Sequence, residues 1–404
     1  MAEGMNTGPA GAVVMSNDDV RQQLAAQASS IGRFQAPEIW FTQTVSLTAP
    51  NQITIPRQMP LNRPAESITL QLLLRATVAN NNMTAVVPEA PATLIRQIQL
   101  NGTHRKWANL TPLRMSGETA YFWPSLFQRS GGTTIINGAL AADPGIPFVS
   151  PFTGLVGAHD MIIEWNIPLG PLMGIGQATK RELASFLYNA EDWGDSLQLQ
   201  LNLGDASALG TPNAPGDVTI TAFGSGAGTP TLNIFVNYSI LGPFAGAIES
   251  GVIIRNEQLF NQFVTAGVRQ RISQLQKQIT LNTLLKSGTI LAGTTSGVSV
   301  FGTLSDAILD QTMPVVDNKP IKFNQNNNME KAYVSRMFAV PIPEGYFNLT
   351  WVDGQNPMLS YRADGLAGGS LFELQSDILT TQAQTLAMVQ EMSYGGPFPA
   401  LRPL

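Results

Sequence analysis

The chain of 404 residues has no cysteine, only two histidines and little charge. The lack of cysteine excludes disulfide bonds and thiolate metal sites. His104 and His159 are far apart in the sequence, so a histidine-rich metal site is excluded and a hydrolase triad would depend on one isolated ring. We therefore expect no cofactor and no metal ion, and we predict that the protein is not an enzyme.

Charge is scarce: Asp, Glu, Lys and Arg make up 13% of the residues, against roughly 25% in typical domains. The chain has seven Lys beside 16 Arg and 14 Met. Interface cores are likewise poor in Lys and rich in Met and Arg, which predicts an obligate oligomer. The alternative is a neutral surface of Asn, Gln, Ser and Thr. The net charge of −5, without a block of like charge, argues against binding nucleic acid through its phosphates.

The last part of the chain repeats a segment from its middle. Residues 231–244, TLNIFVNYSILGPF, and residues 385–398, TLAMVQEMSYGGPF, agree at six of fourteen positions without a gap, at a separation of 154. A repeat of this kind indicates two copies of one domain joined head to tail. The alternative is a chance match between two short segments.

A second pair of segments supports the duplication. Residues 161–172 and 334–347 are both apolar runs that contain Ile-Pro followed by a turn. The stretch from this Ile-Pro to the Gly-Pro-Phe of each repeat is 21 residues longer in the first copy. Residues 179–182, TKRE, form a capping box, and the apolar residues after it fall on one helical face: Leu183, Phe186, Leu187 and Ala190. We expect an inserted surface helix to account for the extra length.

Short apolar or alternating runs, separated by Gly, Pro and Asn turns, dominate the chain after residue 38 and predict β-sandwiches. The first set of strands is expected at 39–47, 68–78, 94–100, 161–167, 197–203, 218–223 and 232–241. The second set begins near Leu259 and is expected at 272–281, 289–292, 298–301, 333–340, 346–351, 358–361, 370–374 and 386–392. The Gly- and Pro-rich segment 101–160 is interpreted as a long loop with a functional or interface role.

Each candidate for chemistry is weaker than its structural alternative. Residues 174–180 faintly resemble a phosphate-binding loop but lack its spacing and its βαβ context, so a helix entry is the better interpretation. A glycosidase needs a pair of carboxylates, but the acidic residues available are better explained as solvated turn residues: Asp160, Glu164, Glu191, Asp192 and Asp195. The tryptophans, which could stack on sugars, are more simply explained as core or subunit contacts: Trp107, Trp123, Trp165, Trp193 and Trp351.

The order of these features resembles a known family. A polar helix predicted near residues 16–32 comes first, and WNIPL at 165–169 then ends a strand. The motifs that follow are ELA at 182–184, LQLQL at 197–201 and IPEGYF at 342–347. This order is similar to that of the double jelly-roll major capsid proteins of tailless, membrane-containing icosahedral phages, the tectivirus-like branch of the adenovirus hexon lineage. The chain departs from the tectivirus pattern in the 101–160 segment and in the Gly-rich 205–230 segment.

The resemblance implies an all-β fold of two tandem jelly rolls with short N-terminal and inter-strand helices. The implied divisions are an N-terminal arm, a first jelly roll, a linker, a second jelly roll and a C-terminal tail, at 1–37, 38–244, 245–262, 263–394 and 395–404. The implied function is a major capsid protein of a bacteriophage, whose homotrimers form the pseudo-hexagonal capsomers of an icosahedral virion after synthesis in the host cytoplasm. The implied partners are neighbouring capsomers, vertex or minor capsid proteins and an internal lipid membrane, without sequence-specific binding of nucleic acid.

Two pairs of residues are predicted to make contacts in such an assembly. Arg21 and Arg33 of the arm would meet lipid head groups at the inner face, weakly because acidic residues lie beside them. Phe398 and Leu404 of the tail would clamp a neighbouring subunit.

Two other functions stay open from the sequence. A trimeric β-sandwich spike or receptor-binding protein of a virion would share the composition but would not need two equivalent domains. A two-domain β-sandwich hydrolase or sugar-binding protein would need an acidic pair or an aromatic platform that converges in a cleft.

Overall fold

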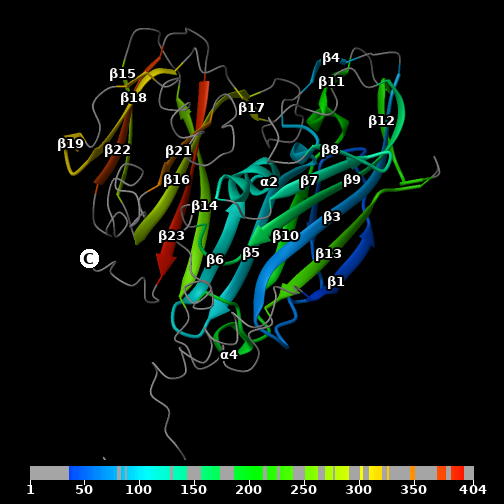
Figure 1. Cartoon of the computed structure of the whole chain (residues 1–404), viewed down its shortest axis with the longest axis horizontal. Helices are drawn as coiled ribbons and strands as arrows, with labels where there is room; N and C mark the ends of the chain where they lie inside the picture. Colours follow the sequence, from blue (N-terminus) through cyan, green and yellow to red (C-terminus); the bar gives the residue numbers. More distant parts are fainter. Residues whose placement is uncertain are drawn as a thin grey trace, which may run out of the picture.

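The computed structural model is almost entirely β-structure, arranged as two sandwiches side by side (Figure 1). It describes residues 36–79, 83–86, 89–127, 131–142, 156–172, 186–212, 216–224, 228–239, 251–262, 269–275, 278–290, 301–303, 309–320, 325–326, 346–350, 371–378 and 384–394. The predicted N-terminal helix and tail contacts, with Arg21, Arg33, Phe398 and Leu404, lie outside these residues, as do the 174–180 segment and Trp351. The predicted fold class, two tandem β-sandwiches, is confirmed.

The first sandwich consists of two facing sheets. One sheet has the order β1 (Ala36–Thr44), β13 (Thr231–Tyr238), β3 (Ala65–Val78), β9 (Gly157–Pro168), β7 (Gly132–Ile136) and β8 (Ala139–Ala142), with β12 (Val218–Thr221) also paired to β3. The other has the order β2 (Asn51–Thr54), β10 (Gln198–Leu203), β5 (Ile95–His104) and β6 (Ala108–Met115). Short elements connect these strands: β4 (Met83–Val86), η1 (Ala92–Leu94), α2 (Gly117–Leu126), α4 (Ala190–Trp193), η2 (Ala206–Ala208) and β11 (Gly210–Pro212).

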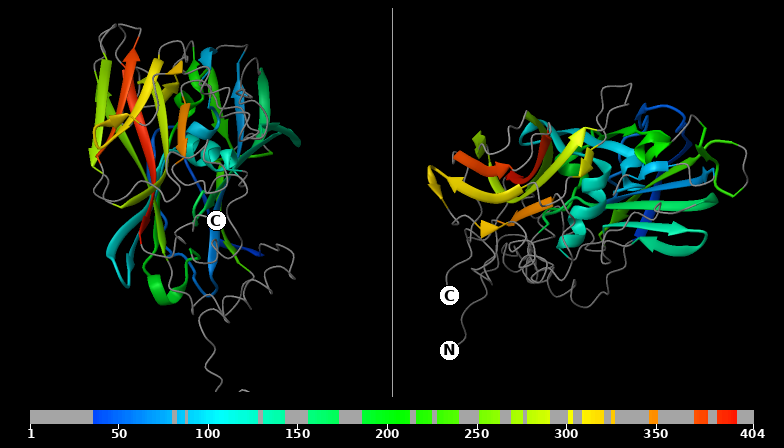
Figure 2. Two further views of the ribbon diagram at one scale, coloured as in Figure 1. Left: turned by 60° about the vertical axis from the view of Figure 1, so that its left-hand side comes forward. Right: turned by 90° about the horizontal axis from the view of Figure 1, so that it is seen from above.

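The second sandwich is built in the same way. Its first sheet has the order β14 (Val252–Gln262), β23 (Gln384–Tyr394) and β16 (Ile279–Ile290), and β16 also pairs with β21 (Tyr346–Thr350) and β17 (Phe301–Thr303). Its other sheet has the order β15 (Arg269–Leu275), β22 (Leu371–Ile378), β18 (Leu309–Val316) and β19 (Lys319–Pro320), with β20 (Gln325–Asn326) paired to β18. Figure 2 shows both sandwiches from the side and from above.

The alternation of the strands explains the core of the first sandwich. Along β3 every second side chain from Ile68 to Val78 is buried, and the residues between them are partly exposed. Leu199, Leu201 and Leu203 of β10 do the same from the facing sheet. Burying a Leu or Ile side chain stabilises a fold by about 1.5–3 kcal/mol, so this period-two pattern is sufficient to fix which face of each strand turns inward.

The strand order confirms the internal duplication. The order β1-β13-β3-β9 of the first sandwich recurs as β14-β23-β16-β21 in the second, and β2-β10-β5 recurs as β15-β22-β18. The two halves of the sequence match, β13 and β23, therefore occupy the same place, each between the first and third strands of its sheet.

The explanation offered for the extra length of the first copy is wrong. Strand β9 ends at Pro168, whereas its counterpart β21 begins at Tyr346, after Pro343, so the two Ile-Pro motifs are not equivalent. The extra length lies largely between β10 and β13, where residues 204–230 correspond to residues 379–383 between β22 and β23. The predicted helix is described only from Phe186 onward. There, Tyr188 makes a β-bridge with Ala65, and the short helix α4 begins at Ala190.

Three other local predictions are corrected. The supposed loop 101–160 contains the ends of β5 and β9, the strands β6, β7 and β8, and helix α2. All ten residues of α2 are buried, so it has no polar face to reveal it as a helix. Residues 252–262, assigned to the linker, form β14. The strand was missed because its buried side chains include Arg255, so that its pattern resembles that of an exposed segment. The strand expected at 272–281 is split between β15 and β16.

Candidate functional site: the junction between the two sandwiches

The two sandwiches share one continuous sheet. Strand β14 of the second sandwich pairs in parallel with β6 of the first, with Arg255 opposite Leu113 and Asn256 opposite Arg114. This pairing joins β2-β10-β5-β6 to β14-β23-β16 in a nine-stranded sheet. The face of β14-β23-β16-β21 that carries Arg255, Leu284 and Val389 then meets helix α2 and the segment that follows β9. We call this contact the junction.

Helix α2 is placed against the junction by its N-terminal cap. The Oγ of Ser116 accepts a hydrogen bond from the N–H of Thr119 at 3.4 Å, and Glu118 lies in the first turn, where the helix dipole favours a negative charge. Gly117 is required here because a Cβ would lie 2.1 Å from the carbonyl oxygen of Ile95. Figure 1 shows α2 between the two sandwiches.

An apolar cluster forms the centre of the junction. The first sandwich supplies Phe122, Trp123, Leu126, Phe127 and Leu172, and the second supplies Leu284, Tyr346 and Val389. All eight are buried, and the rings of Phe122 and Tyr346 lie 5.4 Å apart. The cluster is separate from the main core of the first sandwich. It therefore belongs to the contact between the sandwiches.

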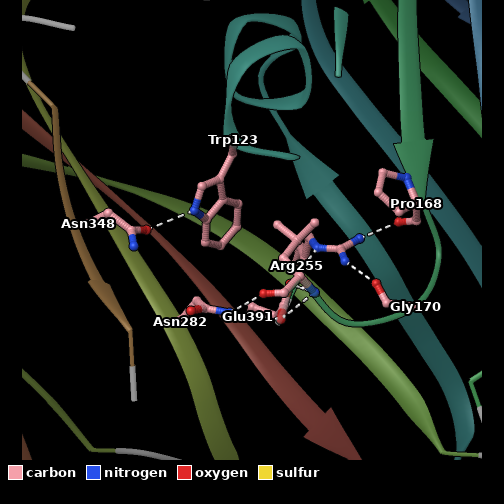
Figure 3. A network of polar contacts seen from close by, with 8 residues as sticks. Trp123, Pro168, Gly170, Arg255, Asn282, Asn348 and Glu391 are labelled. Carbon is pink, nitrogen blue, oxygen red and sulfur yellow. Dashed lines mark hydrogen bonds and ion pairs between the residues drawn. The ribbon is translucent and has the colours of Figure 1, made fainter. Parts of the chain in front are cut away.

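Arg255 of β14 and Glu391 of β23 form a buried ion pair beside this cluster, with 3.0 Å between Nε and Oε2 (Figure 3). The Arg255 side chain is 3% exposed and that of Glu391 is fully buried. Arg255 also donates to the carbonyl oxygens of Pro168, the last residue of β9, and of Gly170, just beyond that strand in the first sandwich. One guanidinium thus ties a strand of the second sandwich to the backbone of the first.

The Glu391 carboxylate accepts further hydrogen bonds from both sides of the junction. The N–H of Leu172 donates to its two oxygens at 3.0 and 3.1 Å, and the Nδ2 of Asn282 donates to Oε1 at 3.1 Å. The same Nδ2 donates to the carbonyl oxygen of Leu172 at 3.0 Å. Above this network, the indole N–H of Trp123 donates to Asn348 Oδ1 at 3.0 Å (Figure 3). Such contacts have fixed directions, so they set the relative position of the two sandwiches more closely than apolar packing does.

Lys286 of β16 anchors the helix end of the junction. Its fully buried ammonium lies 2.7 Å from Glu118 Oε1 and 2.8 Å from Glu257 Oε1. It also donates to the Oγ of Ser116 and the Oγ1 of Thr119, both at 2.9 Å. Glu257 in turn accepts from the backbone N–H of Ser116 at 2.7 Å. Charges from the second sandwich thus hold the N-terminus of α2.

The two carboxyls around Lys286 differ in their pKa values. Burial raises the pKa of Glu118, and the nearby Glu257 adds to this effect while Lys286 opposes it. The pKa of Glu257 is lowered, because the ammonium of Lys286 and the N–H of Ser116 outweigh the opposing effect of burial. The pKa of Lys286 is raised, since the two carboxyls outweigh the burial that would lower it. Lys286 and Glu257 therefore form the charged pair, and Glu118 is the group that holds a proton more easily.

The residues considered for catalysis do not converge. Asp160 and Glu164 are both on β9, four residues and therefore roughly 13 Å apart, too far for the carboxylate pair of a glycosidase. Asp160 is paired with Arg75 at 2.7 Å, and Glu164 accepts from Gln71 at 2.6 Å. Asp192 accepts from Asn189 at the start of α4. These acids serve the structure of the first sandwich.

The histidines and tryptophans also have structural surroundings. His104 is stacked on Trp107, with 4.5 Å between ring centroids, and meets Trp193 edge-on at 4.9 Å. Burial lowers the pKa of His104, which favours its neutral form. Trp123, Trp165 and Trp193 are buried, as the core interpretation predicts. No group of His, Asp or Glu that could hold a metal ion occurs among the described residues, and no helix there has the length and apolar content to cross a membrane.

The junction residues themselves were missed from the sequence. Arg255, Glu257, Asn282, Lys286 and Glu391 are polar residues inside strands, where alternation predicts an exposed face. A signal was present in the repeat, because Glu391 occupies the position of Asn237, one of the eight positions that differ between the two segments.

Comparison with known proteins supports the fold. No family model and no curated protein matches the chain. The atomic structure of Sulfolobus turreted icosahedral virus matches over 90% of this chain and 91% of its own, with a TM-score of 0.58 at 12% identity. The crystal structure of the STIV major capsid protein (MCP) matches over 89% and 98%, with a TM-score of 0.53 at 13% identity. These structures are double jelly rolls, so the chain has the double jelly-roll fold.

Proposed function

We propose that the chain is a major capsid protein that assembles as homotrimers into pseudo-hexagonal capsomers of an icosahedral virion. The observation that carries the proposal is the pair of equivalent sandwiches, held side by side by the buried junction. The likeness to the STIV MCP over 89% of this chain and 98% of that one supports it. Three chains with two sandwiches each present six similar units, the number that a hexagonal tile needs.

The junction suits a protein that must tile a shell. Lattice contacts repeat many times, so a small error in the angle between the sandwiches would accumulate across neighbouring capsomers. Two buried ionic clusters and an apolar centre join the sandwiches through many independent contacts. Removing one partner of a buried ion pair strongly destabilises a fold, because the other charge is left unpaired. Partly open arrangements of the two sandwiches, which would separate these partners, are therefore disfavoured. We infer that the junction makes the chain a rigid double tile.

The proposed partners follow from this role. They are neighbouring capsomers, vertex or minor capsid proteins and an internal lipid membrane toward which the N-terminal arm, with Arg21 and Arg33, would point. The tail residues Phe398 and Leu404 would contact a neighbouring subunit. The proposed location is the virion shell, and the proposed role is structural, without catalysis or a cofactor.

The oligomeric state tests the proposal. We expect the purified chain to elute from size exclusion as one species whose mass, measured by light scattering, is three times that of the chain. A stable monomer or a dimer at micromolar concentration would contradict the proposal. A spike or receptor-binding protein would also be trimeric, but it would appear elongated by negative-stain microscopy, whereas a capsomer has a hexagonal outline.

A further inference from the structure

The sheet β1-β13-β3-β9 of the first sandwich has an outward face that is partly open to solvent. This face, which we call the outer face, carries Ile39, Thr69, Gln71, Glu164 and Phe235. Ile39 is 60% exposed, the most exposed large apolar side chain of the described residues, and the other four are partly exposed. Ile39 lies on the edge strand β1 directly opposite Phe235, so the two apolar side chains form one partly exposed patch, which is a candidate contact.

The internal repeat gives each position of β13 a counterpart on β23, and the strands on either side follow from the pairing. Phe235 corresponds to Val389 at the separation of 154. Phe235 lies between Ile39 and Thr69 in the sheet, and Val389 lies between Glu257 and Leu284. The outer face of the first sandwich is therefore equivalent to the junction face of the second.

The next row of each sheet follows the same rule. Asn237 lies between Pro37 and Ser67, and its counterpart Glu391 lies between Arg255 and Asn282. In the junction, Glu391 and Asn282 are buried by the first sandwich of the same chain. Asn237 and Ser67 are also buried, at 5% and 3%, but the neighbouring row of Ile39, Phe235 and Thr69 is exposed or partly exposed. Part of the outer face is therefore open in a single chain, whereas the equivalent face of the second sandwich is covered.

We propose that the outer face of the first sandwich is the docking surface for the second sandwich of another copy of this chain. The inference rests on the proposed trimer and identifies its contact surface. Within a chain, the first sandwich covers the face of the second. Between chains, the second sandwich of each chain would cover the outer face of the next chain's first sandwich. Every sandwich would then cover the equivalent face of its neighbour, and three chains would close a ring of six sandwiches.

The chemistry of the outer face suits such a contact. The row formed by Ile39, Phe235 and Thr69 carries no charge, as is usual in the cores of protein interfaces. The polar side chains of the outer face are already held by cross-strand hydrogen bonds. Gln71 donates to Glu164 at 2.6 Å and accepts from Asn233 at 3.0 Å. Side chains fixed before binding lose little conformational entropy when a partner covers them.

The substitution Ile39→Lys tests the surface, and Ile279→Lys is its matched control. Both isoleucines are exposed, at 60% and 38%, but Ile279 lies on β16 of the second sandwich, away from the outer face. We expect Ile39→Lys to lose the trimer, with the mass by light scattering falling to one third, while Ile279→Lys stays trimeric. Both should keep the circular dichroism spectrum and the melting behaviour of a folded chain, because each side chain is exposed.

Thiol labelling gives a second test that does not depend on disrupting the assembly. The chain has no cysteine, so Ile39→Cys and Ile279→Cys each introduce one reactive group. In the trimer we expect the thiol at position 39 to lose its reaction with a maleimide and to regain it when the trimer is dissociated by dilution. The thiol at position 279 should react in both states.

The outcomes separate this inference from the proposed function. A wild-type chain that is not trimeric would overturn both. A wild-type trimer that survives Ile39→Lys, with the thiol at position 39 labelled as fast as that at position 279, would overturn the docking surface and leave the trimeric capsomer standing. Loss of the trimer in Ile39→Lys alone, together with protection at position 39, supports the inference.

Discussion

Replacing Arg255 by methionine is expected to destabilise the chain by about 3–5 kcal/mol, because the carboxylate of Glu391 is left buried without a cation. Glu391 is fully buried, so water cannot compensate for the lost partner. The carbonyl oxygens of Pro168 and Gly170 also lose their donors. Denaturant unfolding followed by tryptophan fluorescence would measure the change.

Two further variants show whether the effect arises from the unpaired charge. In Arg255→Met/Glu391→Gln the charge is removed and an oxygen is kept for the N–H of Leu172, so part of the lost stability should return. Arg75→Met breaks the ion pair with Asp160, whose side chains are 26% and 24% exposed, and should have a much smaller effect. Equal losses for Arg255→Met and Arg75→Met would contradict the account of the junction.

Replacing Lys286 by methionine should produce a defect that grows with pH. The ammonium now lies between the buried carboxyls of Glu118 and Glu257, at 2.7 and 2.8 Å. Without it, burial and mutual repulsion raise the pKa of both carboxyls in the folded state. A group with a raised folded pKa contributes stability below its unfolded pKa, about 4.3 for Glu, and loses that contribution as the pH rises through the folded pKa.

The wild-type cluster balances two opposite dependences. The raised pKa of Glu118 favours folding at low pH, and the lowered pKa of Glu257 favours folding above the ordinary pKa of a glutamate. Removing Lys286 removes the second effect, so the loss of stability should be larger at pH 8 than at pH 5, reaching about 3–5 kcal/mol when both carboxyls must ionise. Urea unfolding at the two pH values would measure it.

The control for this pH dependence is the variant Lys286→Met/Glu118→Gln/Glu257→Gln. It has no ionisable group in the cluster, so its stability should change between pH 5 and pH 8 no more than that of the wild type. A loss in Lys286→Met that is the same at both pH values would show that the cluster acts through packing and not through charge.

The sequence predicted the parts of the fold that depend on local patterns. Alternation in β3 and β10 identified strands because one face of each is buried in the first sandwich. The short match between β13 and β23 identified the duplication because both strands occupy the same place in equivalent sheets. Such patterns depend only on contacts between elements of one sandwich.

The junction could not be predicted in this way, because its residues are placed by partners far away in the sequence. Lys286 and Glu118 are separated by 168 residues, and Leu172 and Glu391 by 219. In the sequence, the charged side chains on β14, β16 and β23 have the pattern of a solvent-exposed face. In the structure, α2 covers them. Helix α2 is itself buried on all sides and lacks the periodicity of a surface helix. Neither α2 nor the strands that it contacts therefore have a sequence pattern that indicates the junction.

The most direct test of the account is an electron cryomicroscopy reconstruction of the purified wild-type chain. We predict a particle with threefold symmetry and six β-sandwiches in a ring, in which alternate contacts are the junction within a chain and the outer face between chains. A particle in which the two sandwiches of a chain are separated, or in which the face that carries Ile39 and Phe235 remains open to solvent, would contradict it.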